Sequence, residues 1–180
     1  RKVRTQYTIF FLQKMKDEVR SKPGDYVFNE RFYQDFPITS SAIFEAMRLY
    51  PVAFSIWRKA KVKCNIEGYI IPKGKTVCVS LFNVHRNPKF WNDPNKFIPE
   101  RFNEEESKNR PKHHFMPFGW GNRKCIGDHY SMMIIFLTVI KTLMRYDVKI
   151  IPVPKLVVKS AALMCPEKVE ARIKFYEKEK

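Results

Sequence analysis

The sequence offers little material for cross-linking or for crossing a membrane. Its four cysteines, Cys64, Cys78, Cys125 and Cys165, lie far apart and form no C-x-x-C pair. This spacing favours neither a zinc site nor a disulfide framework, and a reducing compartment fits it best. No apolar run reaches the roughly 20 residues that span a bilayer, and we expect no signal peptide in this sequence.

Acidic residues are also scarce: 18 Asp and Glu stand against 34 Lys and Arg, which gives a formal net charge of +16. A nucleic-acid binder would cluster its basic residues with stacking aromatics or in a known module. Here they are spread along the whole chain, so we expect no nucleic-acid partner. An acidic protein or an anionic membrane surface suits such a field better, and a solvated basic surface is the alternative.

What the chain does contain is a glycine-rich segment at 115–127, FMPFGWGNRKCIG, followed by an apolar, helix-like run at 130–144. We call residues 115–127 the cysteine segment. It brings one thiol, Cys125, to an expected helix N-terminus, where unpaired N–H groups and the helix dipole favour an anion. The thiolate is the form of cysteine that binds metals, and Arg123 adds a positive charge suited to an anionic cofactor group. A buried structural thiol is the alternative for Cys125.

The cysteine segment resembles the haem-binding loop of the cytochrome P450 family, whose signature is F-x-x-G-x-R-x-C-x-G. Phe118, Gly121, Arg123, Cys125 and Gly127 match every fixed position. The resemblance implies that haem b (iron protoporphyrin IX) is the cofactor and that Cys125 is its axial iron ligand and the catalytic residue. It also implies that Phe118 packs beside the thiolate, that the two glycines admit the porphyrin, and that Arg123 holds a propionate.

An expected helix at 42–50, with N-cap oxygens offered by Thr-Ser-Ser at 39–41, carries the second part of the resemblance. Glu45 and Arg48 lie one turn apart on it, in a sequence that resembles the family's E-x-x-R helix. Arg101, in the sequence P-E-R-F, matches the third member of the family's charged cluster. The resemblance implies that the three form a buried structural network, and an ordinary surface ion pair is the alternative for Glu45 and Arg48.

The remaining sequence predicts helices and short strands. We expect a helix at 7–22, a short packed helix with Phe28, Phe32 and Phe36 in the core, strands at 56–59, 63–66 and 76–81, a polar meander at 103–114 and a hairpin after 149. With the resemblance, the expected fold class is mainly α with a small β-sheet, the C-terminal part of the cytochrome P450 fold. We expect residues 1–180 to be the haem-ligating part of one domain. Because the chain begins without Met and inside an expected helix, we expect a fragment or a processed product, without the family's N-terminal part and membrane anchor.

Several further residues acquire expected roles from the resemblance. Arg58 matches a second propionate-binding arginine, with an exposed surface charge as the alternative. The largely apolar residues that follow the E-x-x-R helix, and residues 160–163, would line a pocket for a lipophilic substrate, with core packing as the alternative. The first group is Val52, Ala53, Phe54 and Ser55. His85 has no second ligand at metal spacing, so we expect a hydrogen-bonding structural residue.

The leading hypothesis is that the full-length parent is a haem-thiolate monooxygenase that oxidises a lipophilic small molecule. It would use O2 and electrons from NADPH–cytochrome P450 reductase, an acidic partner for which Lys112, Lys124 and Lys141 are docking candidates. NADPH would act only through that reductase. The family implies the cytoplasmic face of the endoplasmic reticulum membrane, and this piece alone should be inactive.

Two alternatives stay open. The C-terminal sequence resembles the microsomal branch that includes drug-metabolising and thromboxane-synthase types. This likeness suggests a haem-thiolate isomerase or dehydratase of a lipid hydroperoxide or endoperoxide, which needs no reductase. The abrupt start suggests a non-catalytic, truncated haem-binding remnant.

Overall fold

The computed structural model describes residues 2–29, 32–151, 156–158, 164–166 and 170–176. The helices are α1 (Lys2–Arg20), α2 (Phe32–Asp35), α3 (Pro37–Leu49), α4 (Leu81–Val84), α5 (Glu104–Asn109) and α6 (Asp128–Arg145), with 3-10 turns η1 (Pro99–Phe102), η2 (Lys112–His114) and η3 (Gly121–Arg123). The strands are β1 (Ser55–Lys59), β2 (Cys64–Ile66), β3 (Tyr69–Ile71), β4 (Thr76–Ser80), β5 (Tyr146–Ile151), β6 (Leu156–Val158), β7 (Met164–Pro166) and β8 (Glu170–Phe175). They pair antiparallel as β1–β4, β2–β3, β5–β8 and β6–β7. The expected fold class, mainly helical with small sheets, is confirmed.

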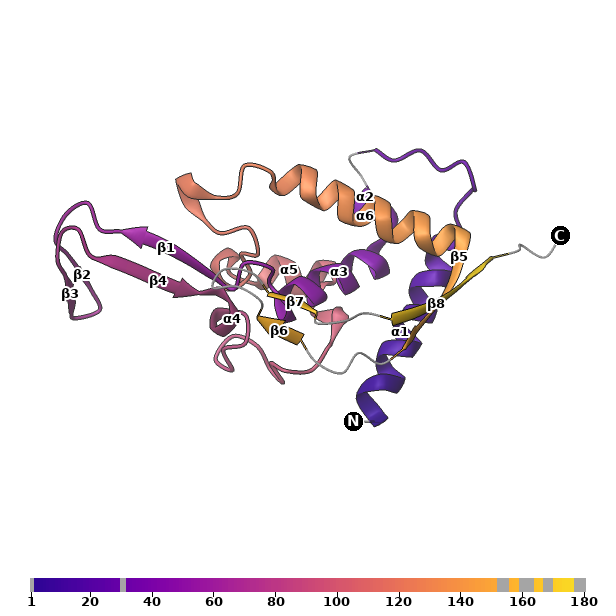
Figure 1. The fold of residues 1–180 in the computed structure, drawn as a ribbon, viewed down its shortest axis with the longest axis horizontal. Helices are drawn as coiled ribbons and strands as arrows, with labels where there is room; N and C mark the ends of the chain where they lie inside the picture. Colours follow the sequence, from indigo (N-terminus) through magenta and orange to yellow (C-terminus); the bar gives the residue numbers. More distant parts are fainter. Residues whose placement is uncertain (1, 30–31, 152–155, 159–163, 167–169, 177–180) are drawn as a thin grey trace.

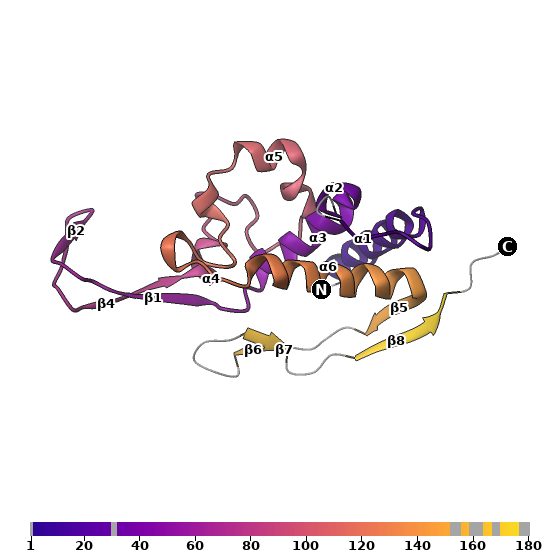
Figure 2. The ribbon, with the colours of Figure 1, turned by 90° about the horizontal axis from the view of Figure 1, so that it is seen from above.

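The helices gather in the middle of the molecule, and β1 and β4 project from them as a long arm with β2 and β3 at its tip (Figure 1). The pair β5–β8 lies at the opposite end, where α6 ends. Seen from above, α6 runs between the base of the arm and β5–β8 (Figure 2). The start of α6, where the cysteine segment joins it, therefore faces the arm.

The core forms where α6 packs against α2 and α3 and where α1 closes the other side. Met132, Phe136, Ile140 and Leu143 are buried and recur every three or four residues, so they form one apolar stripe along α6. The ring of Phe136 lies 4.9 Å from that of Phe32. Phe32 and Phe36 are buried and Phe28 packs against the core, as expected, although only Phe32 is part of a helix.

The N-terminus of α3 differs from the sequence prediction. The helix starts at Pro37, so the Thr-Ser-Ser segment at 39–41 lies inside it and makes no N-cap. The carboxylate of Glu18, on α1, accepts hydrogen bonds from the backbone amides of Ile38 (2.7 Å) and Thr39 (2.8 Å), and from the Thr39 hydroxyl (2.6 Å). A residue twenty positions earlier thus satisfies the free amides and joins α1 to α3.

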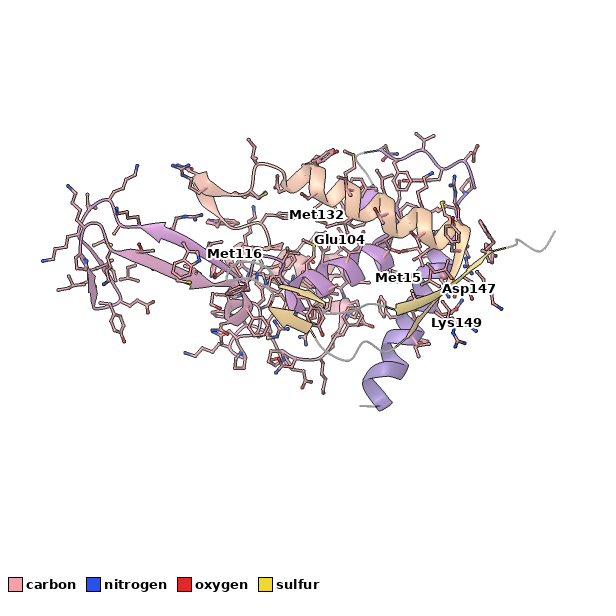
Figure 3. All side chains as sticks on the ribbon, viewed as in Figure 1. Met15, Glu104, Met116, Met132, Asp147 and Lys149 are labelled. Atoms are coloured by element: carbon pink, nitrogen blue, oxygen red, sulfur yellow. The ribbon has the colours of Figure 1, made fainter. Side chains whose placement is uncertain are left out.

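The C-terminal end of α6 is fixed by basic residues of α1. Lys16 forms an ion pair with Asp147 on β5, and Asp147 lies at the end of α6 (Figure 3). Arg20 donates to the carbonyls of Leu143 (3.2 Å) and Tyr146 (3.1 Å), which are free at a helix end. These contacts join the C-terminal end of α6 and the start of β5 to α1.

The other boundaries lie close to the expected ones. The polar meander at 103–114 contains the exposed helix α5, whose side chains are not buried. The strand expected at 76–81 ends at Ser80, because the hydroxyl of Ser80 accepts from the Asn83 amide and starts α4. Within the described ranges, no helix combines the length and apolarity needed to cross a bilayer.

Candidate functional site

Two glycine turns fold the cysteine segment. Gly119 and Gly121 have φ of +78° and +71°, a region that residues with a side chain rarely adopt. The Gly119 amide donates to the Met116 carbonyl (2.9 Å), and the Cys125 amide donates to the Phe118 carbonyl (2.9 Å). The second bond folds Cys125 back against Phe118, three residues before α6 begins.

Cys125 has an exposed, free thiol next to the N-terminus of α6. Gly127 precedes the helix, and a Cβ placed there would lie 4.0 Å from the Cys125 sulfur. Asp128, in the first turn of α6, forms an ion pair with Lys124. The hydrogen bond from Lys124 lowers the pKa of the Asp128 carboxyl, and the backbone of His129 adds to the effect. Lys124 thus offsets a negative charge close to a cysteine that must ionise to bind a metal.

Several large apolar side chains close to Cys125 in sequence are exposed. Large apolar residues of the cysteine segment and of the first turns of α6 are exposed: Trp120, Ile126, Tyr130, Met133 and Ile134. Among the described residues, no group of three or more His, Cys, Asp or Glu is placed to hold a metal ion. A single thiolate beside an apolar surface fits haem, because a porphyrin brings its own nitrogen ligands and a flat apolar face.

Strand β1 lies beside the cysteine segment. A Cβ on Gly119 would lie 3.9 Å from the Ile56 side chain. Arg58 is two residues further along β1 and so shares the face of Ile56. It is half-buried and donates to the carbonyl of Trp57, whereas Arg123 is exposed in η3. The two arginines expected to hold propionates therefore come from β1, which contacts Gly119, and from η3, which follows it in the cysteine segment.

The expected pocket residues lie at the base of the arm. Val52 is exposed, Ala53 and Phe54 are half-buried, and the hydroxyl oxygen of Ser55 is buried without a hydrogen-bond partner in the described residues. A shallow hollow lined by Glu104, Glu105, Lys108 and Asn109 lies on α5 and contains none of the expected site residues. Residues 160–163, the second expected lining, fall outside the described residues.

Glu45 and Arg48 are fully buried and form a two-pronged ion pair on α3. The Nε and Nη2 of Arg48 donate to the Glu45 carboxylate at 2.6 and 2.8 Å. The guanidinium also donates to the carbonyls of His85 (2.7 Å), Pro94 (2.8 Å) and Lys96 (3.1 Å). All five N–H groups thus have acceptors, which a buried arginine requires.

Arg101 approaches the same carboxylate from η1. Its Nε lies 3.5 Å from Oε1 of Glu45, an ion-pair distance without an aligned hydrogen bond, and its Nη2 donates to the Asp93 carbonyl (3.0 Å). Oε1 also accepts from the Ile98 amide (2.8 Å). The three charged residues that the sequence grouped therefore lie together and connect α3 to the segment at 85–101.

His85 has a role that sequence reasoning described only as structural. Its side chain is fully buried, and Nε2 accepts a hydrogen bond from the Met116 amide (3.1 Å). Burial, together with the positive charges of Arg48 and Arg86, lowers the pKa of His85 to about 4. The guanidinium of Arg86 stacks on the ring of Phe82, with 3.8 Å between the guanidinium carbon and the ring centre. The sequence gives no signal for the contact between His85 and Met116, which are 31 residues apart.

The lysines expected near the cysteine segment differ in their surroundings. Lys124 is paired with Asp128, and Lys141 lies over the ring of Phe28 at 5.3 Å. Lys112 is exposed.

Comparisons with known proteins agree with this geometry. Residues 11–171 match the profile of the family described as Cytochrome P450. The chain is 36% identical to Cytochrome P450 3A25 of Mus musculus over 76% of its own length and 27% of that protein, and 40% identical to Cytochrome P450 3A40 of Oryzias latipes over 57% and 20%. The chain thus spans about a quarter of the length of these relatives. The solved structure titled "Retinoic acid bound cyanobacterial CYP120A1" superposes with a TM-score of 0.82 at 22% identity, over 95% of this chain and 40% of that one.

Proposed function

The chain belongs to the cytochrome P450 family, and from this premise we propose that its full-length parent is a haem-thiolate monooxygenase of lipophilic small molecules. Residues 1–180 are the C-terminal, haem-ligating part of its single domain. The observation that carries the proposal is the exposed thiol of Cys125, placed between two glycine turns and the start of α6 beside an apolar surface.

Each site residue has a definite task in this proposal. Cys125 provides the thiolate that ligates haem b, and Phe118 packs beside it. Gly121 forms the second turn, because its φ of +71° is one that residues with a side chain rarely adopt. Arg58 and Arg123 pair with the propionates through charge-assisted hydrogen bonds. The bound haem supplies the oxygen activation, which a thiolate ligand favours.

In this proposal the residues at the base of the arm line the substrate pocket and determine which substrate binds. Val52, Ala53, Phe54 and Ser55 offer mostly apolar contacts. The Ser55 hydroxyl, which has no hydrogen-bond partner among the described residues, offers one polar group that can orient a substrate. A lipophilic substrate follows from this composition.

Electrons come from NADPH through the acidic NADPH–cytochrome P450 reductase. A net charge of +16 favours the approach of an acidic partner. Lys112 is the docking candidate with the least engaged ammonium group, because Lys124 pairs with Asp128 and Lys141 lies over an aromatic ring. We place the protein at the cytoplasmic face of the endoplasmic reticulum membrane on the family's precedent.

Turnover by the purified full-length protein tests the proposal. Oxidation of lipophilic probe compounds should require O2, NADPH and the reductase together. It should disappear in Cys125→Ser and persist in Cys78→Ser, a control at another exposed cysteine. Conversion of a lipid hydroperoxide without reductase, and no oxidation with it, would instead favour the isomerase alternative. If neither activity is detected, the remaining hypothesis is the non-catalytic, truncated haem-binding remnant.

A further inference from the structure

The ring of His85 joins two parts of the molecule that are distant in sequence. It has no exposed surface, and its Nε2 accepts from the backbone amide of Met116, the second residue of the cysteine segment. The ring also packs against Phe115, with 5.4 Å between ring centres. Met116 lies near the base of the arm (Figure 3). The first residues of the cysteine segment are thus held by one imidazole.

The backbone of the same residue contacts the buried ion pair. The His85 carbonyl accepts from Nη1 of Arg48 at 2.7 Å, and Arg48 is itself held by both oxygens of Glu45. His85 therefore links the Glu45–Arg48 pair, through its carbonyl, to the cysteine segment, through its ring.

Two backbone hydrogen bonds connect the position of Met116 to that of Cys125. The Met116 carbonyl accepts from the Gly119 amide, and the Phe118 carbonyl accepts from the Cys125 amide, both at 2.9 Å. Fixing Met116 fixes the first glycine turn, and that turn includes Phe118, the residue that holds Cys125.

The hydrogen bond requires a neutral ring. Because Nε2 is the acceptor, the proton of the imidazole resides on Nδ1, and a second proton would remove the only acceptor. The charged groups that face the ring are the guanidiniums of Arg48 and Arg86, which oppose a positive ring, while the Glu45 carboxylate is engaged by Arg48. The Arg48 backbone carbonyl acts in the other direction. Nδ1 makes no aligned hydrogen bond among the described residues. Within that part of the chain, the bond that Nε2 accepts from the Met116 amide is therefore the aligned hydrogen bond of the ring.

We propose that His85 is a positioning residue of the cysteine segment: its neutral ring holds the Met116 amide and thereby sets Cys125 in the place from which it ligates haem. The second half of this statement rests on the proposed function.

The test compares three variants of the full-length protein. His85→Leu fills the space without an acceptor, His85→Gln keeps an oxygen acceptor at the end of a side chain of similar length, and His113→Gln changes an exposed histidine as the matched control. Two quantities are measured: the hydrogen-exchange rate of the Met116 amide, and the fraction of the reduced, carbon-monoxide-bound protein with the red-shifted absorption of thiolate-ligated haem.

His85→Leu should raise Met116 exchange about tenfold or more, the effect of losing one buried hydrogen bond, and should reduce the thiolate-ligated fraction at equal haem content. Exchange of the Ile98 amide, which is bonded to Glu45, should change less. His85→Gln should restore both quantities towards wild type, and His113→Gln should alter neither.

Wild-type exchange and spectrum in His85→Leu would overturn the proposal. If His85→Leu does not fold, His85→Gln decides: protection of the Met116 amide supports the positioning role, and its loss contradicts it. A wild-type protein that never shows thiolate ligation would defeat the proposed function, while the exchange rates would still test the contact of His85 with the cysteine segment.

Discussion

Replacing Arg48 with methionine should remove most of the stability of this part of the fold. The substitution keeps an unbranched side chain but deletes a guanidinium that is fully buried and makes five hydrogen bonds. Among the described residues, the Glu45 carboxylate would keep the Ile98 amide and the looser contact with Arg101.

The size of the effect follows from the burial. Breaking a buried ion pair by removing one partner costs about 3–5 kcal/mol, because a charge stays in the interior uncompensated. The carbonyls of His85, Pro94 and Lys96 would also lose a donor, at about 1–3 kcal/mol for each group that stays dry, although water entry reduces this sum. A domain is stable by about 5–15 kcal/mol, so the variant should be largely unfolded or should unfold at much lower denaturant.

Denaturant unfolding of the full-length protein measures this loss. The buried ring of Trp91 lies 4.9 Å from the Arg48 guanidinium carbon, so tryptophan fluorescence includes a reporter close to the change. Replacing Glu45 with glutamine in the Arg48→Met background should recover part of the loss, since the unpaired charge disappears.

The control is the exposed pair formed by Glu104 and Lys108 on α5, which has the same chemistry in water. Lys108→Met should leave the unfolding midpoint close to wild type, because exposed ion pairs contribute little. Equal midpoints for Arg48→Met and Lys108→Met would refute the assignment of Arg48 to a buried structural pair.

Three further predictions follow from contacts of the fold. Glu18→Ala should cost about 1–2 kcal/mol in denaturant unfolding, as for a lost N-cap, because the amide of Thr39 loses its acceptor, and Asp17→Ala on the exposed face should not. The pKa of His85 falls from 6.5 to about 4 on folding, so between these pH values the unfolded chain binds more protons than the folded one. The free energy of unfolding should therefore decrease as the pH drops, by up to about 3 kcal/mol at pH 4. His85→Gln should lack this component of the pH profile. Phe136→Ala should lower the free energy of unfolding by about 3–5 kcal/mol, because its buried ring fills the space between α2 and α6, and an unchanged melting temperature would contradict this packing.

The features predictable from sequence are those set by short spacings. The cysteine segment has five fixed positions within ten residues, and Glu45 and Arg48 are one helical turn apart. Helix periodicity and glycine turns act over the same range, so α1, α3, α6 and the arm lie near their expected positions. Arg101 was grouped with Glu45 by family resemblance, and the contact is present in the fold.

The contacts that could not be predicted from the sequence are those between residues distant in the chain. The local signal for the start of α3, Thr-Ser-Ser at 39–41, was wrong, because Glu18 supplies the capping oxygens from another helix. The pairing of Lys16 with Asp147 spans 131 positions. The bond from the Met116 amide to His85 likewise depends on how α3 and the loops pack, which no local pattern records.

The absorption spectrum of the reduced, carbon-monoxide-bound full-length protein tests the central claim most directly, when wild type is compared with Cys125→Ser. The account predicts the red-shifted band of thiolate-ligated haem in the wild type and its loss in Cys125→Ser, with the band retained in Cys78→Ser. The same red-shifted band in Cys125→Ser, at equal haem content, would show that another residue ligates the iron and would contradict the account.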